Sequence, residues 1–166
     1  MKLSVAAMTH LVQHTAAGEG RELTAPDGVH TVKIDAAHTD DQYELFEVDA
    51  TRGPTTPPHR TGWPKAYYVL NGRMMVQVED EGFDLGPGSS ITIPPGALHT
   101  FTVLSPTTKF LAVGLTAAMG RFFADLDGSV PHGHPIEEVA QQIQEVLDRH
   151  DVIVAGFETA DLESVS

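Results

Sequence analysis

Apolar and polar residues alternate along short segments in the first two thirds of the chain. A period of two is typical of β-strands that bury one face. Turns rich in glycine and proline separate these segments, and about eight short strands of this kind indicate an all-β sandwich or barrel. The strands are predicted at residues 29–34, 43–49, 65–70, 73–78, 83–85, 91–93, 99–103 and 109–115.

Two local features add detail to this strand pattern. Asn71-Gly72 separates two predicted strands, and Asn-Gly is the strongest short hairpin signal. We therefore expect the two strands that flank it to pair with each other. In the strand at residues 29–34 we expect His30 and Lys33 to point to solvent.

Beyond residue 116 the apolar spacing becomes that of helices. Residues 117–126 are predicted to form a helix that ends at Asp127-Gly128, and residues 136–149 an amphipathic one. We expect the second helix to pack its apolar stripe against the outside of the barrel. That stripe consists of Ile136, Val139, Ala140, Ile143, Val146 and Leu147. Residues 3–12 permit another short helix.

A chain of 166 residues is expected to form one domain. The pattern divides it into an N-terminal arm (1–27), a barrel (28–116), a helical extension (117–157) and an acidic tail (158–166).

Composition excludes several classes of function. Ten Lys and Arg residues against 23 Asp and Glu residues give a net charge of −13, which disfavours nucleic acid and anionic membranes as partners. The chain has no cysteine, so disulfides, thiolate metal ligands and a cysteine nucleophile are excluded. No apolar run approaches the ~20 residues of a membrane span. The apolar run Leu3–Met8 is weak as a signal peptide, so we expect a cytoplasmic protein.

The stretch from Gly88 to Val103 combines a strand, a Pro-Pro-Gly turn and a strand that opens with a histidine. It resembles the second motif of the cupin superfamily, which reads G-x5-P-x-G-x2-H-x3-N. Gly88, Pro94, Gly96 and His99 match this motif, whereas Val103 stands where the family usually has asparagine.

The Pro-rich segment upstream resembles the first cupin motif, H-x-H, a short gap, E, six residues and G. His59 and Gly72 match, whereas Thr61 replaces the second histidine and Lys65 the glutamate. The flanking segments Glu44–Val48 and Met119–Phe123 look like those of small quercetin-dioxygenase-like monocupins. The resemblance covers about residues 28–155.

The resemblance implies the cupin double-stranded β-helix, a jelly-roll barrel, with the C-terminal helices packed outside. In metal-binding cupins three histidines and one glutamate converge on one ion. Here His59 and His99 remain, Thr61 offers only a neutral hydroxyl, and a protonated Lys65 would repel a divalent ion. We therefore expect no catalytic metal. The alternative is one divalent ion (Fe, Ni, Mn, Cu or Zn) held by His59, His99 and a third ligand that the sequence does not identify.

Several residues could complete such a metal site. They are Glu44, Glu47, Gln77, His132 and His134, and the simpler interpretation of the two loop histidines is a solvated loop.

Alternation and the resemblance place Lys65 and Tyr67 on the inward face of their strand. We assign Lys65, His59, His99 and Tyr67 as catalytic. Burial near positive groups would lower the pKa of Lys65, which could bind an enolate, act as an acid or base, or form a Schiff base. His59 and His99 would titrate near neutrality, and Tyr67 could donate to an oxyanion. The competing interpretation is that Lys65 reaches the barrel mouth and pairs with a carboxylate such as Glu47.

A mainly apolar wall would hold the ligand inside the barrel. The candidate substrate-binding residues are Trp63, Phe46, Met75, Phe101 and Thr61, with Met74 as a further wall residue.

Three functions are compatible with these residues. The first is a metal-independent enzyme that performs proton transfer (cyclisation, isomerisation, dehydration or lyase cleavage) on a small, largely apolar carbonyl or aromatic compound of secondary metabolism. The second is a metal-dependent, quercetinase-like dioxygenase, and the third a small-molecule binding protein without catalysis. The resemblance also implies a homodimer, since cupins commonly associate through sheet edges and terminal arms.

Overall fold

The computed structural model describes residues 11–53 and 56–155. Its strands are β1 (Arg21–Ala25), β2 (Gly28–Ile34), β3 (Glu44–Thr51), β4 (His59–Arg60), β5 (Lys65–Asn71), β6 (Met74–Val78), β7 (Glu81–Leu85), β8 (Ser90–Ile93), β9 (His99–Val103), β10 (Thr107–Gly114) and β11 (Ile153–Val154). Its helices are the short 3-10 turns η1 (Ala36–His38) and η2 (Ile136–Glu138) and the α-helices α2 (Ala118–Ser129) and α3 (Ala140–Arg149). The all-β fold with C-terminal helices is confirmed.

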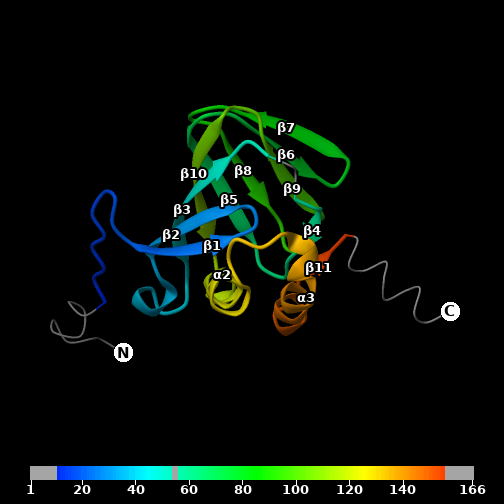
Figure 1. The fold of residues 1–166 in the computed structure, drawn as a ribbon. Coiled ribbons are helices and arrows are strands. Elements are labelled where there is room, and N and C mark those ends of the chain that lie inside the picture. The colour runs from blue at the N-terminus through cyan, green and yellow to red at the C-terminus, as the bar shows by residue number, and fades with distance from the viewer. Residues whose placement is uncertain (1–10, 54–55, 156–166) are drawn as a thin grey trace.

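Two antiparallel sheets form the barrel (Figure 1). One has the strand order β1-β2-β3-β10-β5-β8, and the other the order β11-β4-β9-β6-β7. Alternate residues of β3 and β5 are buried, as expected for strands with one face toward a core. This is the two-sheet jelly-roll arrangement that the resemblance implied, and it agrees with the sandwich or barrel that the strand pattern indicated.

The predicted hairpin at Asn71-Gly72 is wrong. β5 pairs with β8 and β10, whereas β6 pairs with β7 and β9, so the chain passes from one sheet to the other at this turn. Gly72 is required there because its φ is +79° and because a Cβ would collide with the carbonyl oxygen of Thr107. The hairpin of this region lies one strand later, at the turn between β6 and β7.

The arm and the helices also differ from the sequence interpretation. Residues 21–25 of the predicted arm form β1, an edge strand of the larger sheet. Residues 11–20 form no helix, and the rest of the helix expected at residues 3–12 lies outside the described residues. The predicted helix at residues 136–149 is interrupted at Val139, which separates η2 from α3.

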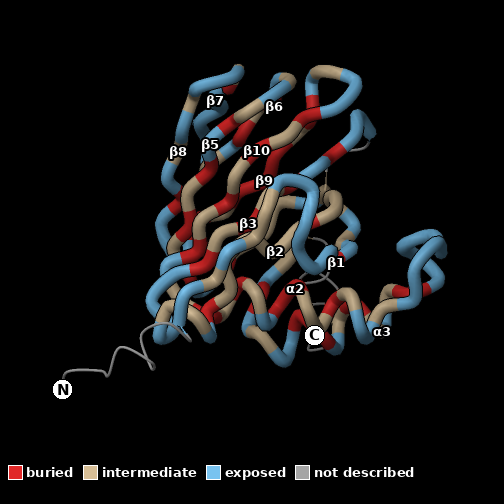
Figure 2. The backbone as a smooth tube through the Cα atoms, turned by 90° about the vertical axis from the view of Figure 1, so that its left-hand side faces the viewer, coloured by how far each residue is buried: buried red, intermediate tan, exposed pale blue. Residues whose placement is uncertain are grey.

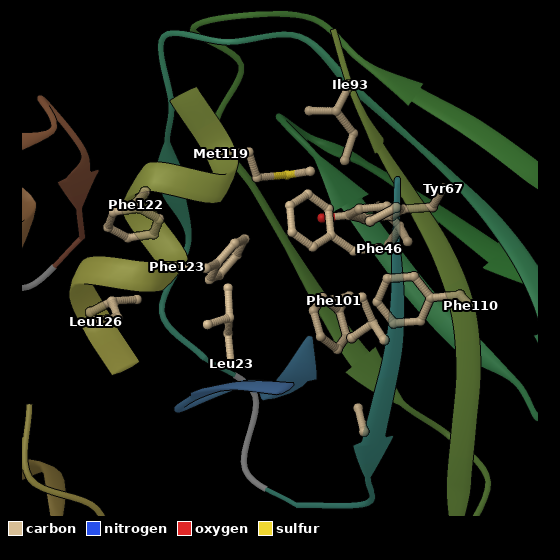
Figure 3. Close-up of a cluster of buried hydrophobic side chains, with 14 of the residues drawn as sticks. Leu23, Phe46, Tyr67, Ile93, Phe101, Phe110, Met119, Phe122, Phe123 and Leu126 are labelled. Atoms are coloured by element: carbon tan, nitrogen blue, oxygen red, sulfur yellow. The ribbon is translucent and has the colours of Figure 1, made fainter. Parts of the chain in front are cut away.

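The helices lie across one end of the barrel (Figures 1 and 2). Figure 3 shows Met119 and Phe123 of α2 on the side of this helix that faces the aromatic residues of the strands. Phe123 contacts Phe46 of β3 at a ring-centroid distance of 6.4 Å. The barrel and α2 therefore share one apolar core. Among the described residues, no helix has the length and apolar character that a membrane crossing requires.

Candidate functional site

A cavity of about 140 Å³ lies between the barrel interior and the two C-terminal helices. The strands contribute aromatic and aliphatic residues, and α2 and α3 contribute a second apolar wall. Polar side chains are few, as in sites that bind small organic molecules. They are Asp27, His30, Thr56, His59, Thr61 and Lys65, together with the amphipathic Trp63 and Tyr67.

His59 and His99 form an adjacent pair because they are register partners on β4 and β9. Their ring centroids lie 4.3 Å apart. Nδ1 of His99 lies 2.8 Å from the carbonyl oxygen of Ala97, and Nδ1 of His59 lies 3.3 Å from that of Pro57. Each Nδ1 therefore carries the hydrogen that donates to a carbonyl, which leaves Nε2 as an acceptor. Nε2 of His99 is buried and has no partner among the described residues.

Both imidazoles are held neutral. Burial and the positive charge of Lys65 lower the pKa of His59 to about 3 and that of His99 to about 4. The expectation that these histidines titrate near neutrality is therefore wrong, because an uncharged ring is favoured in an apolar site beside a cation. At neutral pH the two rings act as hydrogen-bond acceptors and weak bases.

Lys65 points into the barrel from β5 and is only 6% exposed. Its ammonium nitrogen lies 5.7 Å from the ring centroid of Tyr67, within the range of a cation–π contact. Burial lowers the pKa of Lys65 to about 8, and the negative charge of Asp27 offsets only part of that effect. The proposed pairing with Glu47 is wrong, because Glu47 binds Lys109 at 2.9 Å.

Two residues of this site were missed in the sequence. His30 is 3% exposed, lines the cavity and stacks on Phe123 of α2 at a centroid distance of 3.9 Å. Its Nε2 lies 4.0 Å from Oδ2 of Asp27, which also lines the cavity. The expectation that His30 points to solvent is wrong. The alternation of side chains along the strand could have shown this, since residues 30 and 33 of an extended strand lie on opposite faces and cannot both point to solvent.

The structure places three of the five predicted substrate-binding residues, Trp63, Phe101 and Thr61, in the cavity wall. Phe46 is buried but lies in the core rather than in the wall. Met75 lies outside the cavity, because Met74 and Val76 are the inward residues of β6.

Tyr67 also lines the cavity, and Figure 3 shows its hydroxyl oxygen pointing into the apolar cluster. Burial raises the pKa of Tyr67 above its usual value. The phenol therefore keeps its proton at neutral pH and is a hydrogen-bond donor rather than a base.

Comparisons with known proteins agree with this architecture. A family model described as the cupin domain matches residues 45–114. The polyketide cyclase RemF from Streptomyces resistomycificus superposes with a TM-score of 0.54 and 28% sequence identity, covering 62% of this chain and 78% of that one. Residues 45–114 therefore form a cupin domain. KdgF from Halomonas sp. shares this fold, with a TM-score of 0.53, 20% identity and coverage of 60% of this cupin and 91% of KdgF.

In sequence, this cupin is similar to quercetin 2,3-dioxygenase of Bacillus subtilis (strain 168). The two chains are 24% identical over 139 residues, which is 82% of this cupin. The matched region is 41% of the dioxygenase, so this cupin spans about two fifths of its relative's length.

Among the described residues, the side chains at the motif positions do not make up the ligand set of a catalytic metal. Such an ion usually takes three protein ligands, and the motif positions supply only His59 and His99, with a hydroxyl at Thr61 and an ammonium at Lys65. Within residues 11–53 and 56–155, no group of three or more His, Cys, Asp or Glu residues could hold an ion.

The residues considered as further ligands lie elsewhere. Glu44 accepts a hydrogen bond from the main-chain nitrogen of Gly120 in α2 (3.0 Å), and Gln77 is exposed on β6. His132, in the loop after α2, lies 3.3 Å from Asp127 of that helix. His134 lies 3.2 Å from Glu138 and, like His132, is about half exposed.

Proposed function

We propose that this cupin catalyses proton transfer on a small, largely apolar carbonyl or aromatic compound without a catalytic metal. The observation that carries the proposal is Lys65, a buried amine beside two neutral imidazoles in an apolar cavity. A lysine whose pKa is near 8 exchanges its proton readily at physiological pH, which is what general acid–base catalysis requires.

The geometry suggests a division of roles. Lys65 in its neutral form removes a proton next to a carbonyl, and in its charged form it stabilises the resulting enolate. The weakly basic ring of His59, which lines the cavity, accepts a hydrogen bond from a substrate hydroxyl, and Tyr67 donates to an oxygen that gains charge. The aromatic walls exclude water, which strengthens each of these interactions.

The similarity to RemF, a polyketide cyclase, supports cyclisation within this class of reactions. Ring closure of a polycarbonyl chain begins with removal of a proton next to a carbonyl and ends with loss of water. Both steps need proton transfer in a cavity with apolar walls, and neither needs a redox-active ion.

The similarity to quercetin 2,3-dioxygenase favours a second candidate, a metal-dependent dioxygenase. That function needs a divalent ion at His59 and His99 and a third ligand, which the described residues do not provide. A protein that only binds a small molecule is the third candidate. The homodimer and the cytoplasmic location stay predictions.

Deuterium exchange distinguishes these functions. Trp63 is the only tryptophan and lines the cavity, so quenching of its fluorescence selects, from a panel of enolisable ketones such as tetralone, those that enter. We expect chelator-treated protein to accelerate α-proton exchange of a bound ketone in deuterium oxide, and Lys65→Met to abolish the acceleration. Lys109→Met, which changes a partly exposed lysine outside the cavity, should retain it.

Two results would contradict the proposal. Bound ketones that exchange no faster than in buffer would support a binding protein. Activity that disappears with chelator and returns with a divalent ion would support the metal-dependent function.

A further inference from the structure

We propose that Lys65 is a nucleophilic amine that condenses with a carbonyl carbon of the ligand to form a Schiff base. The inference rests on the proposed function and adds a covalent step and a ligand class, aldehydes and ketones with a second oxygen nearby. It follows from three features of the structure: the isolation of the amine, its protonation state and the polar atoms around it.

Lys65 differs from the other described lysines in its lack of partners. Lys33 donates to two main-chain carbonyl oxygens at 2.8 Å each. Lys109 pairs with Glu47 at 2.9 Å and Asp49 at 3.6 Å. Lys65 makes no hydrogen bond or ion pair with any described residue, although it is almost fully buried. An amine needed only for structure would be expected to have such partners.

The environment of Lys65 favours the reactive form of the amine. Only an uncharged amine has the lone pair that attacks a carbonyl, and burial is a known way of producing it in enzymes. The pKa of Lys65 is lowered to about 8, whereas the carboxylates beside Lys109 raise the pKa of that lysine. Near neutral pH, Lys65 therefore carries a much larger uncharged fraction than Lys109.

The buried polar atoms near this amine suggest what it binds. Three buried side-chain atoms lack a partner within the described residues: Nδ1 of His30, Nε1 of Trp63 and Nε2 of His99. All three are nitrogens, and His30 and Trp63 line the cavity with Lys65. The indole nitrogen can only donate, so a ligand that satisfies it must carry an acceptor oxygen. A dicarbonyl compound offers one carbonyl to Lys65 and a second oxygen to Trp63.

The condensation is balanced without an external oxidant or reductant. The nitrogen of Lys65 forms a bond to the carbonyl carbon, and the electron pair of the C=O bond moves to oxygen, which takes up a proton. The resulting carbinolamine loses this oxygen as water and forms the C=N bond. The neutral ring of His59, which lines the cavity, can relay the proton from nitrogen to oxygen. Addition of water reverses the sequence and releases the amine.

A β-diketone tests this step directly, because its Schiff base rearranges to a conjugated enaminone that persists and absorbs in the near ultraviolet. We would incubate the full chain with acetylacetone and measure intact mass, near-ultraviolet absorbance and the modified peptide. The expected result is one adduct, with the mass of the diketone less one water, on the peptide that contains Lys65.

Two variants show whether the nucleophile or only the charge matters. Lys65→Arg keeps a cation but removes the nucleophilic amine, so it should form no adduct. Lys109→Met should form the adduct as the wild type does. Near-ultraviolet circular dichroism of each variant checks that the fold is retained.

The proposal is overturned if the wild-type protein forms no adduct, or if the label lies on other lysines and persists in Lys65→Arg. Such a result leaves the proposed function standing when the wild type still accelerates ketone exchange and Lys65→Met does not, since Lys65 would then act as an acid or base without forming a covalent bond. Loss of both adduct formation and ketone exchange removes the proposed function as well.

Discussion

Replacing Lys65 by methionine should stabilise the protein at neutral pH. The native environment lowers the pKa of this amine from 10.5 to about 8, and one pKa unit corresponds to about 1.4 kcal/mol. Folding with a protonated Lys65 therefore costs about 3 kcal/mol wherever the amine is charged in both states. Methionine has a similar length and no charge, so Lys65→Met removes this cost.

The pH dependence separates this charge effect from any change in packing. The folded pKa lies below the unfolded one, so the unfolded chain binds more protons between about pH 8 and 10.5 and the stability of the wild type rises with pH in that window. The charge-related advantage of Lys65→Met should fall from about 3 kcal/mol at about pH 7.5 to about 1 kcal/mol at about pH 9.5. His30, His59 and His99 stay neutral in the folded protein throughout this window.

Urea unfolding of both proteins at the two pH values measures this difference. Tyr67 begins to titrate in the unfolded chain near the upper pH, but it does so in both proteins and its effect largely cancels. Lys109→Met is the matched control, and it should be slightly less stable than the wild type because Lys109 pairs with two carboxylates at the surface. A stability difference between wild type and Lys65→Met that does not change with pH would refute a buried, charged Lys65.

Two further predictions concern Asp27, which lines the cavity, and the contact between Gly120 of α2 and Glu44 of β3. The charge of Asp27 raises the pKa of Lys65 against the larger effect of burial, so Asp27→Asn should move the midpoint of acetylacetone labelling to lower pH; a midpoint that stays or rises would show that Asp27 does not act on this amine. Gly120→Ala should lower the free energy of unfolding by about 1–3 kcal/mol, because a Cβ there would collide with the buried carboxylate of Glu44. In the same helix, a Cβ at Gly128 would meet open space, so Gly128→Ala should raise the free energy of unfolding by about 0.5–1 kcal/mol. Equal effects of the two substitutions in chemical denaturation would contradict this packing.

Alternation along single strands correctly placed the inward-facing residues of β5. Lys65 and Tyr67 were predicted to share the inward face, and both line the cavity. Side chains of a strand alternate between faces, and the apolar neighbours of Lys65 show which face is buried. The alternating pattern was sufficient because the face on which a side chain lies depends only on its position within its own strand.

Strand pairing was not predictable in the same way. Asn71-Gly72 specifies a backbone with positive φ, which is common in hairpins, but it does not specify which strands pair. Here the turn lies against the start of β10, where Thr108 donates a hydrogen bond to the carbonyl oxygen of Asn71 (2.9 Å). That hydrogen bond joins residues 37 positions apart, so the sequence next to Asn71 does not indicate it.

The helix side of the cavity was missed for a related reason. The apolar stripe of α3 predicted a packed face, but not that Ile143 and Leu147 would line the cavity across the end of the barrel. His30 is covered by Phe123 of α2, more than ninety positions later in the chain. Its polar character suggested exposure, and only its distant contact explains its burial.

A titration of the lysines tests the central claim most directly, namely that the cavity holds a buried amine that loses its proton near neutral pH. The chain has four lysines, Lys2, Lys33, Lys65 and Lys109, so side-chain signals from isotope-labelled lysine are few enough to follow by nuclear magnetic resonance. The account predicts that one signal, absent in Lys65→Met, titrates with a pKa of about 8, well below the others. Four signals that titrate together near the ordinary lysine pKa of about 10.4 would contradict it.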